Sequence, residues 1–128
     1  MAIRYRVAQR AEAGVKGGGT PQYYAVASKR ELADFRELAQ RMEQRSSATS
    51  ADAMLIFYNL ASLIPELIKQ GKSVKLDGIG IISGTLISEG KDSPEEVTSR
   101  SIKGIKLHFL PDVEMKINLK DCEFEKVK

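Results

Sequence analysis

Few side chains in this 128-residue sequence have the chemistry that catalysis or metal binding requires. His108 is the only histidine, and no nucleophile or second base is spaced to work with it. Cys122, the single cysteine, lies between Asp121 and Glu123, whereas reactive thiols need positive surroundings. With one His and one Cys, a closed structural zinc site within one chain is not expected. We therefore expect no enzyme, no metal and no cofactor, with His108 on a strand surface and Cys122 an idle thiol.

A glycine-rich stretch, residues 14–21, is the other motif with possible chemistry, because glycine loops can cradle phosphates. It has neither the GxxxxGK[ST] spacing nor a GxGxxG motif that opens a helix. Residues 3–8 before it and residues 22–27 after it alternate between apolar and polar side chains, which is typical of strands. We therefore interpret residues 14–21 as the tip of an N-terminal β-hairpin.

Charge indicates a possible partner. The net charge is only +3, but residues 1–30 contain six Lys or Arg and one acid, Glu12. A solvated surface and a contact with a polyanion both explain this excess. No signal peptide is expected, since residues 1–10 alternate and carry three arginines. The single cysteine fits a reducing cytoplasm.

Two helices should follow the hairpin. Ser28 and Glu31 match a capping box, and apolar residues then recur at helical spacing as far as Met42. Thr49 is expected to cap a second helix that Gly71 ends and that Pro65 bends. In this central helix, thirteen of the eighteen residues 51–68 are apolar.

The central helix is too apolar for one small chain to cover. Its polar residues form one narrow stripe, and the rest of its circumference needs apolar neighbours. Asp52 and Glu66 leave thirteen residues between them, short of the ~20 that a bilayer requires, so we expect no membrane span. A second copy of the chain is expected to supply the missing cover.

After Gly71 the apolar residues recur at every second position, which is the spacing of a strand, in place of the helical spacing before it. Residues 74–76, 79–87 and 105–109 are predicted strands, with a tight turn at Asp77–Gly78. Ser93, Pro94 and the acids after them are typical of a helix start, so residues 88–104 should contain a helical turn. Residues 112–120 are expected to form a short helix with Val113, Ile117 and Leu119 inward.

The order of these elements resembles the bacterial histone-like DNA-binding proteins, HU and integration host factor. The resemblance rests on residues 71–80, Gly-Lys-Ser-Val-Lys-Leu-Asp-Gly-Ile-Gly, and on Phe109-Leu110-Pro111-Asp112. It covers about residues 28–120 and is closest to a divergent branch with an N-terminal extension. It implies an intertwined homodimer whose helices form a base, whose sheets form a saddle and whose β-arms embrace DNA.

The arm departs from the family pattern. Family members carry a basic Arg/Lys-Asn-Pro tip, whereas here Ser93 precedes Pro94 and two glutamates follow it. Carboxylates repel phosphates, so we do not expect Pro94 to act as a wedge between bases and assign it to a helical turn. The family Phe of the Gly-Phe-Gly turn is Ile79 here, and the family Gly after the Phe-x-Pro proline is Asp112, which suits a helix cap.

If the chain binds DNA, its contacts should be cations on the polar phase of the strands and on the arm. The alternative for each is a solvated strand face, with local pairing to Glu89, Glu95 or Glu96. A second set lies on the first strand, where arginines could instead protect a sheet edge. The expected phosphate contacts are Lys75, Lys91, Arg100, Lys103, Lys106 and His108, and the second set is Arg4, Arg6 and Arg10.

The sequence thus predicts an α+β fold of the HU type: an N-terminal hairpin extension over residues 1–27 and an HU-like domain over residues 28–128, with an arm at about 88–104. We expect a cytoplasmic, nucleoid-associated homodimer that binds double-stranded DNA as an architectural protein without base readout. It should have no membrane or small-molecule partner. The alternative is a structural or protein-interaction homodimer of the same fold that has lost DNA binding.

Overall fold

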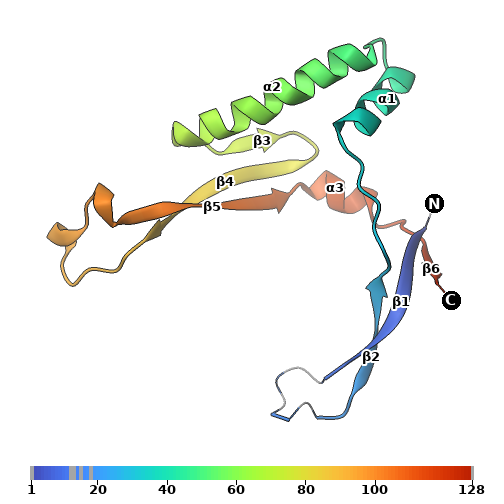
Figure 1. Ribbon diagram of the computed structural model, residues 1–128, viewed down its shortest axis with the longest axis horizontal. Helices are drawn as coiled ribbons and strands as arrows, with labels where there is room; N and C mark the ends of the chain where they lie inside the picture. Colours follow the sequence, from blue (N-terminus) through green and yellow to red (C-terminus); the bar gives the residue numbers. More distant parts are fainter. Residues whose placement is uncertain (1, 12–13, 15, 18, 128) are drawn as a thin grey trace. The chain divides into compact units, whose positions relative to one another are not determined.

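The computed structural model describes residues 2–11, 14, 16–17 and 19–127 (Figure 1). Val15 and Gly18 of the predicted hairpin tip, and Glu12 before it, lie outside the described residues. The chain forms two compact units, one from residues 1–33 with 119–128 and one from residues 34–118. Each unit has its own sheet, and the fold as a whole is mixed α+β.

The first unit contains a three-stranded sheet made from both ends of the chain. β1 (Ile3–Arg10) pairs antiparallel with β2 (Gln22–Ala27), which is the hairpin that the sequence predicts. β6 (Phe124–Lys126) pairs parallel with the other edge of β1, giving the order β2-β1-β6. The sequence pattern assigns residues 119–128 to the HU-like domain, whereas the structure groups them with the N-terminal strands.

The second unit begins with α1 (Phe35–Arg45), six residues later than the predicted Ser28 cap implies. The predicted Ser28 capping box is wrong: Asp34 is the cap, and its carboxylate accepts from the Glu37 N–H at 3.1 Å. The physical reason lies in the hairpin, since the Ser28 N–H donates to the Arg4 carbonyl and so continues the ladder of the first unit.

The central helix, α2 (Ser50–Lys69), begins as the sequence predicts. Thr49 and Asp52 form a reciprocal capping box, and the chain leaves the helix through Gly71 at a φ of 85°. Pro65 lies within the helix without ending it. α1 packs on α2 partly through the Phe35 ring, 5.2 Å from the ring of Phe57 and 5.3 Å from that of Tyr58.

The sheet of the second unit has the order β3-β4-β5, from β3 (Val74–Leu76), β4 (Gly80–Ser88) and β5 (Ile102–Pro111). β4 and β5 extend beyond α2 as an arm that ends in two single turns, η1 (Pro94–Glu96) and η2 (Ser99–Ser101) (Figure 1). η1 confirms the predicted helical turn. α3 (Val113–Asn118) follows β5 directly.

The core of the single chain is small. Among the described residues, Ala39 and Ala53 are the buried apolar residues, and no large side chain is fully buried. The sequence predicts that Val113, Ile117 and Leu119 point inward, but each is more than half exposed. The same is true of Leu55, Ile56 and Tyr58 on α2. By length and composition α2 is also apolar enough to cross a membrane, a test that the core helices of soluble proteins pass as well.

Candidate nucleic-acid interface

One face of the second sheet carries the strand cations. A Cβ placed on Gly84 would lie 3.2 Å from Ile68 Cγ2 of α2, so Gly84 and its alternate neighbours face that helix. The opposite phase of β4 contains Ser83 and Thr85, and the strand register places His108 opposite Ser83 and Lys106 opposite Thr85. Lys75 joins them through its pairing with Ile81. We call Lys75, Ser83, Thr85, Lys106 and His108 the cationic face.

Hydrogen-bonding groups stand between the two lysines of the cationic face. Thr85 Oγ1 lies 2.9 Å from His108 Nε2, and this contact fixes one edge of the imidazole ring. Lys75 is two-thirds exposed and lies 3.8 Å from the Asp77 carboxylate, a weak surface pair. The described residues contain no group of His, Cys, Asp and Glu able to hold a metal ion. This surface therefore offers ammonium groups and hydroxyls, the chemistry that binds phosphate oxygens.

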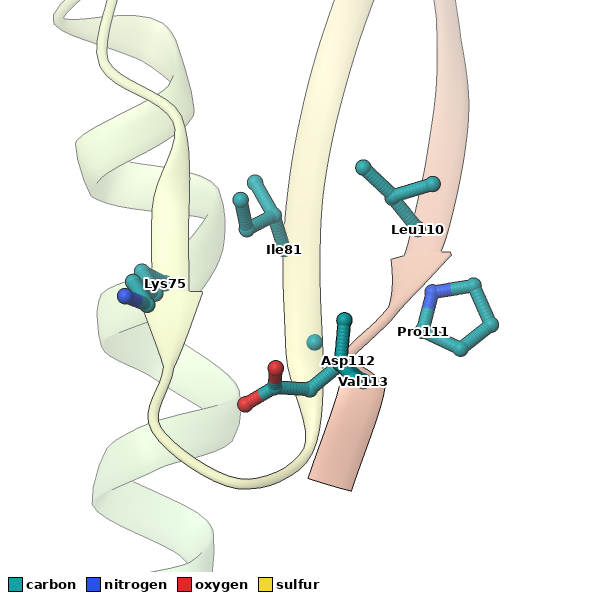
Figure 2. A pocket seen from close by; sticks show the side chains of 7 residues that line it. Lys75, Ile81, Leu110, Pro111, Asp112 and Val113 are labelled. Carbon is teal, nitrogen blue, oxygen red and sulfur yellow. The ribbon is translucent and has the colours of Figure 1, made fainter. Parts of the chain in front are cut away.

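The end of the cationic face near α3 is apolar and slightly hollowed. A shallow cavity of about 200 Å³ is lined by side chains that include Lys75, Ile81, Leu110 and Val113 (Figure 2). That volume is below the range of ~300–1,000 Å³ typical of small-molecule sites. Asp112 also lines it, but its Oδ2 accepts from the Gly78 N–H at 2.9 Å. Asp112 directly precedes α3, as its predicted place as a helix cap requires, and its carbonyl accepts from the Lys116 N–H at 3.2 Å, while its carboxylate links α3 to the β3–β4 turn.

On the arm, two of the three predicted cations are paired with one acid. Lys91 Nζ lies 3.2 Å from Glu89 Oε2, and Lys103 Nζ lies 3.8 Å from Glu89 Oε1. Local pairing with Glu89 is the alternative that the sequence leaves open for these lysines. Arg100, in η2, makes no ion pair with any residue that the structure describes. Pro94 occupies the first position of η1, as expected for a helix start.

The second predicted set lies in the other compact unit. Arg6 pairs with Val26 and Arg10 with Gln22 across the β1–β2 ladder, and Arg4 lies beside Glu125 of β6. Strand alternation puts the three arginines on one face and Ile3, Tyr5 and Val7 on the other. The structure therefore gathers the predicted cations into three groups: the cationic face, the arm and the β1 arginines.

Sequence reasoning missed Ser83 and Thr85, which complete the cationic face. The signal was present, since both occupy alternate positions of a run that is rich in β-forming residues throughout. It also missed that Glu89 holds two cations at once. The Glu89 N–H donates to the Ser101 carbonyl across the arm, a long-range link that no local pattern encodes.

Comparisons with known proteins agree with this architecture. No curated protein matches the sequence. The fold is similar to the crystal structure of a "Putative bacterial DNA binding protein" from Bacteroides vulgatus ATCC 8482, with a TM-score of 0.68 and 11% identity. The likeness covers 98% of this chain and 48% of that one, so this chain spans about half the length of that protein. At this identity, the likeness shows the fold alone.

A family model matches almost the whole sequence. The match extends over residues 1–126, and the family is described as an HU domain fused to wHTH, Ig or glycine-rich motif. It includes the N-terminal strands as well as the helices and the arm. The chain is therefore a member of the HU-HIG family of HU-domain proteins.

Proposed function

We propose that this protein binds double-stranded DNA without enzymatic activity, as a homodimeric, largely sequence-independent architectural protein of the nucleoid in the cytoplasm. The observation that carries the proposal is the cationic face. It places Lys75, Lys106 and His108 on the side of the sheet opposite α2. Membership of an HU-domain family supports the same conclusion.

The chemistry of this face favours contacts with the DNA backbone. Ammonium groups on Lys75 and Lys106 act as point charges for phosphates, and Thr85 and His108 offer neutral hydrogen-bonding groups between them. The groups lie on three strands, β3, β4 and β5, so a sheet rather than a helix would present them to the duplex. Affinity should therefore come from phosphate neutralisation and duplex shape, with Arg4, Arg6 and Arg10 as an additional set of contacts.

The exposure of apolar side chains on α2 supports the proposed homodimer. Leu55, Ile56 and Tyr58 are 60–64% exposed on a helix whose polar stripe is narrow. The sheet side that faces α2 is also open, with Leu107 at 65% and Phe109 at 51%. Exposed apolar surface on this scale marks an interaction site. A second copy placing its own apolar helix there would cover both surfaces in one symmetric interface.

The test is fluorescence anisotropy of the purified full chain with two duplexes of equal length and unrelated sequence. Each duplex is titrated over a salt series that starts at low ionic strength. We expect similar affinities for the two sequences, and a log affinity that falls linearly with log salt concentration. The absence of binding at the lowest salt, or an affinity that does not depend on salt, would remove the DNA proposal.

One observation favours the second candidate, a structural or protein-interaction homodimer. Residues 88–104 contain four acids and three Lys or Arg, a net charge of −1, and two of those cations are paired with Glu89. An arm of this charge is a poor anion ligand as it stands. If the duplexes fail to bind while the protein is a stable dimer, this second function takes the place of the first.

A further inference from the structure

The geometry points to Glu89 as an internal competitor for DNA phosphate, a residue that sets how strongly the arm engages the duplex. This inference rests on the proposed function and adds to it a residue-level control of affinity. Glu89 stands where β4 ends and the arm begins, and each of its two carboxylate oxygens lies within ion-pair distance of a different lysine.

The backbone around Glu89 is well fixed. Its N–H donates to the Ser101 carbonyl at 2.9 Å, and Ser101 itself is only 3% exposed. Ser101 Oγ accepts a hydrogen bond from the Thr98 N–H at 3.1 Å, which ties the start of η2 to Ser101. The fixed backbone keeps the Glu89 carboxylate near Lys91 and Lys103, and both contacts are surface pairs whose side chains are 33–62% exposed.

The position of Lys103 is also set by the ladder. Ile87 pairs with Gly104 and Ser88 with Ile102, so Lys103 is the extra residue on β5 at this irregularity. Irregularities of this kind redirect a side chain. Here the redirected Nζ lies 3.8 Å from Glu89 Oε1, while Lys91 Nζ lies 3.2 Å from Oε2 on the other side.

A carboxylate and a phosphate compete for the same lysine ammonium group. Each presents anionic oxygens to the ammonium group, so a DNA phosphate must displace Glu89 before it can use Lys91 or Lys103. After displacement the Glu89 charge remains beside the incoming backbone and repels it. Glu89 therefore lowers affinity twice, by occupying the cations and by its own charge. Arg100 makes no such pair among the described residues and is available without this cost.

The test compares Glu89→Gln with Glu95→Gln in the full-length protein. Both remove one negative charge from the arm, but Glu95 makes no ion pair with the residues that the structure describes. Anisotropy with a short duplex at low salt is the readout, and circular dichroism checks that each variant is folded. We expect Glu89→Gln to tighten binding by about three- to tenfold and Glu95→Gln by clearly less.

A second comparison asks whether Glu89 acts through its lysines. In a Lys91→Ala/Lys103→Ala background, Glu89→Gln should lose the part of its effect that comes from releasing the cations, and should tighten binding no more than Glu95→Gln does in the same background. Equal gains from Glu89→Gln and Glu95→Gln would overturn the inference in favour of net charge alone. An unchanged or weaker DNA affinity of Glu89→Gln would overturn the inference about Glu89. The proposed function would still stand if the wild-type protein bound DNA in a salt-dependent manner. If no variant binds at the lowest salt, both fail together.

Discussion

Asp112 Oδ2 accepts a hydrogen bond from the Gly78 N–H at 2.9 Å, between residues 34 positions apart in the sequence. The backbone completes the link, because the Asp112 N–H donates to the Ile79 carbonyl at 2.9 Å. These two bonds fasten the start of α3 to the β3–β4 turn, at the edge of the cavity beside the cationic face (Figure 2). The geometry of Lys75, two residues before Asp77, depends on that turn.

Replacing Asp112 should therefore destabilise the second unit. Asp112→Ala leaves the part-buried Gly78 N–H without its acceptor, which costs about 1–3 kcal/mol in the free energy of unfolding. Urea denaturation followed by circular dichroism measures the change. The matched control is Asp77→Ala on the same turn, whose side chain is 92% exposed and whose only partner among the described residues is Lys75. Equal losses in the two variants would contradict the proposed link.

Two glycines of the same sheet should respond in opposite directions to alanine. A Cβ on Gly80 would collide with the Leu110 carbonyl oxygen and would lie 2.7 Å from Phe109 Cε1, so the β4–β5 ladder must move. We expect Gly80→Ala to cost about 1–3 kcal/mol in the free energy of unfolding.

Gly104→Ala is the control, since a Cβ there meets nothing within 4 Å. It should be neutral or stabilising by about 0.4–1 kcal/mol, because alanine restricts the unfolded chain. Thermal and urea unfolding of both variants measure the difference. A Gly104→Ala variant as unstable as Gly80→Ala would show that the register of β4 and β5 differs from the one described.

A charge on α2 should break the proposed dimer. Ile56 is 60% exposed in the single chain, and we propose that a second copy covers it. Burying an unpaired carboxylate is strongly unfavourable, so Ile56→Glu should shift the protein from twice its 14.1 kDa chain mass to the single chain or to an unfolded state. Sedimentation equilibrium measures the mass.

Leu32→Glu is the matched control, because Leu32 is 93% exposed and lies before α1 begins. It should leave the mass unchanged. A wild-type protein that sediments as a single chain would contradict the dimer directly. So would an Ile56→Glu variant that stays folded at the dimer mass.

Local sequence signals predicted the local structure well. The Thr49 cap, the turn at Gly78 and the alternation of β5 depend on residues within a few positions of one another, and all are present. The Ser28 capping box failed because a second cap, Asp34, stands three residues before Glu37, and because Ser28 is held by the hairpin. The sequence alone cannot decide between the Ser28 and Asp34 caps, because the hydrogen bond that holds Ser28 is made to the carbonyl of Arg4, far away in the sequence.

Long-range relationships could not be predicted in the same way. The parallel pairing of Ile3 with Phe124 joins the two ends of the chain, and no periodicity encodes it. Nor does any local pattern show that Glu89 reaches Lys103 across the arm. The predicted inward face of α3 was wrong for the single chain, because apolar spacing identifies a surface to be covered without identifying what covers it. The predicted phosphate contacts themselves stay a prediction.

The most direct measurement is the salt dependence of DNA binding by Lys75→Ala/Lys106→Ala, compared with wild type and with Arg36→Ala/Arg41→Ala. The control removes the same charge from exposed positions of α1. We predict weaker binding of the lysine variant to any duplex sequence, with a salt slope shallower by about 0.9 for each phosphate that the variant no longer neutralises, and a near wild-type slope for the control. Equal slopes and affinities in all three proteins would contradict the assignment of the cationic face to DNA.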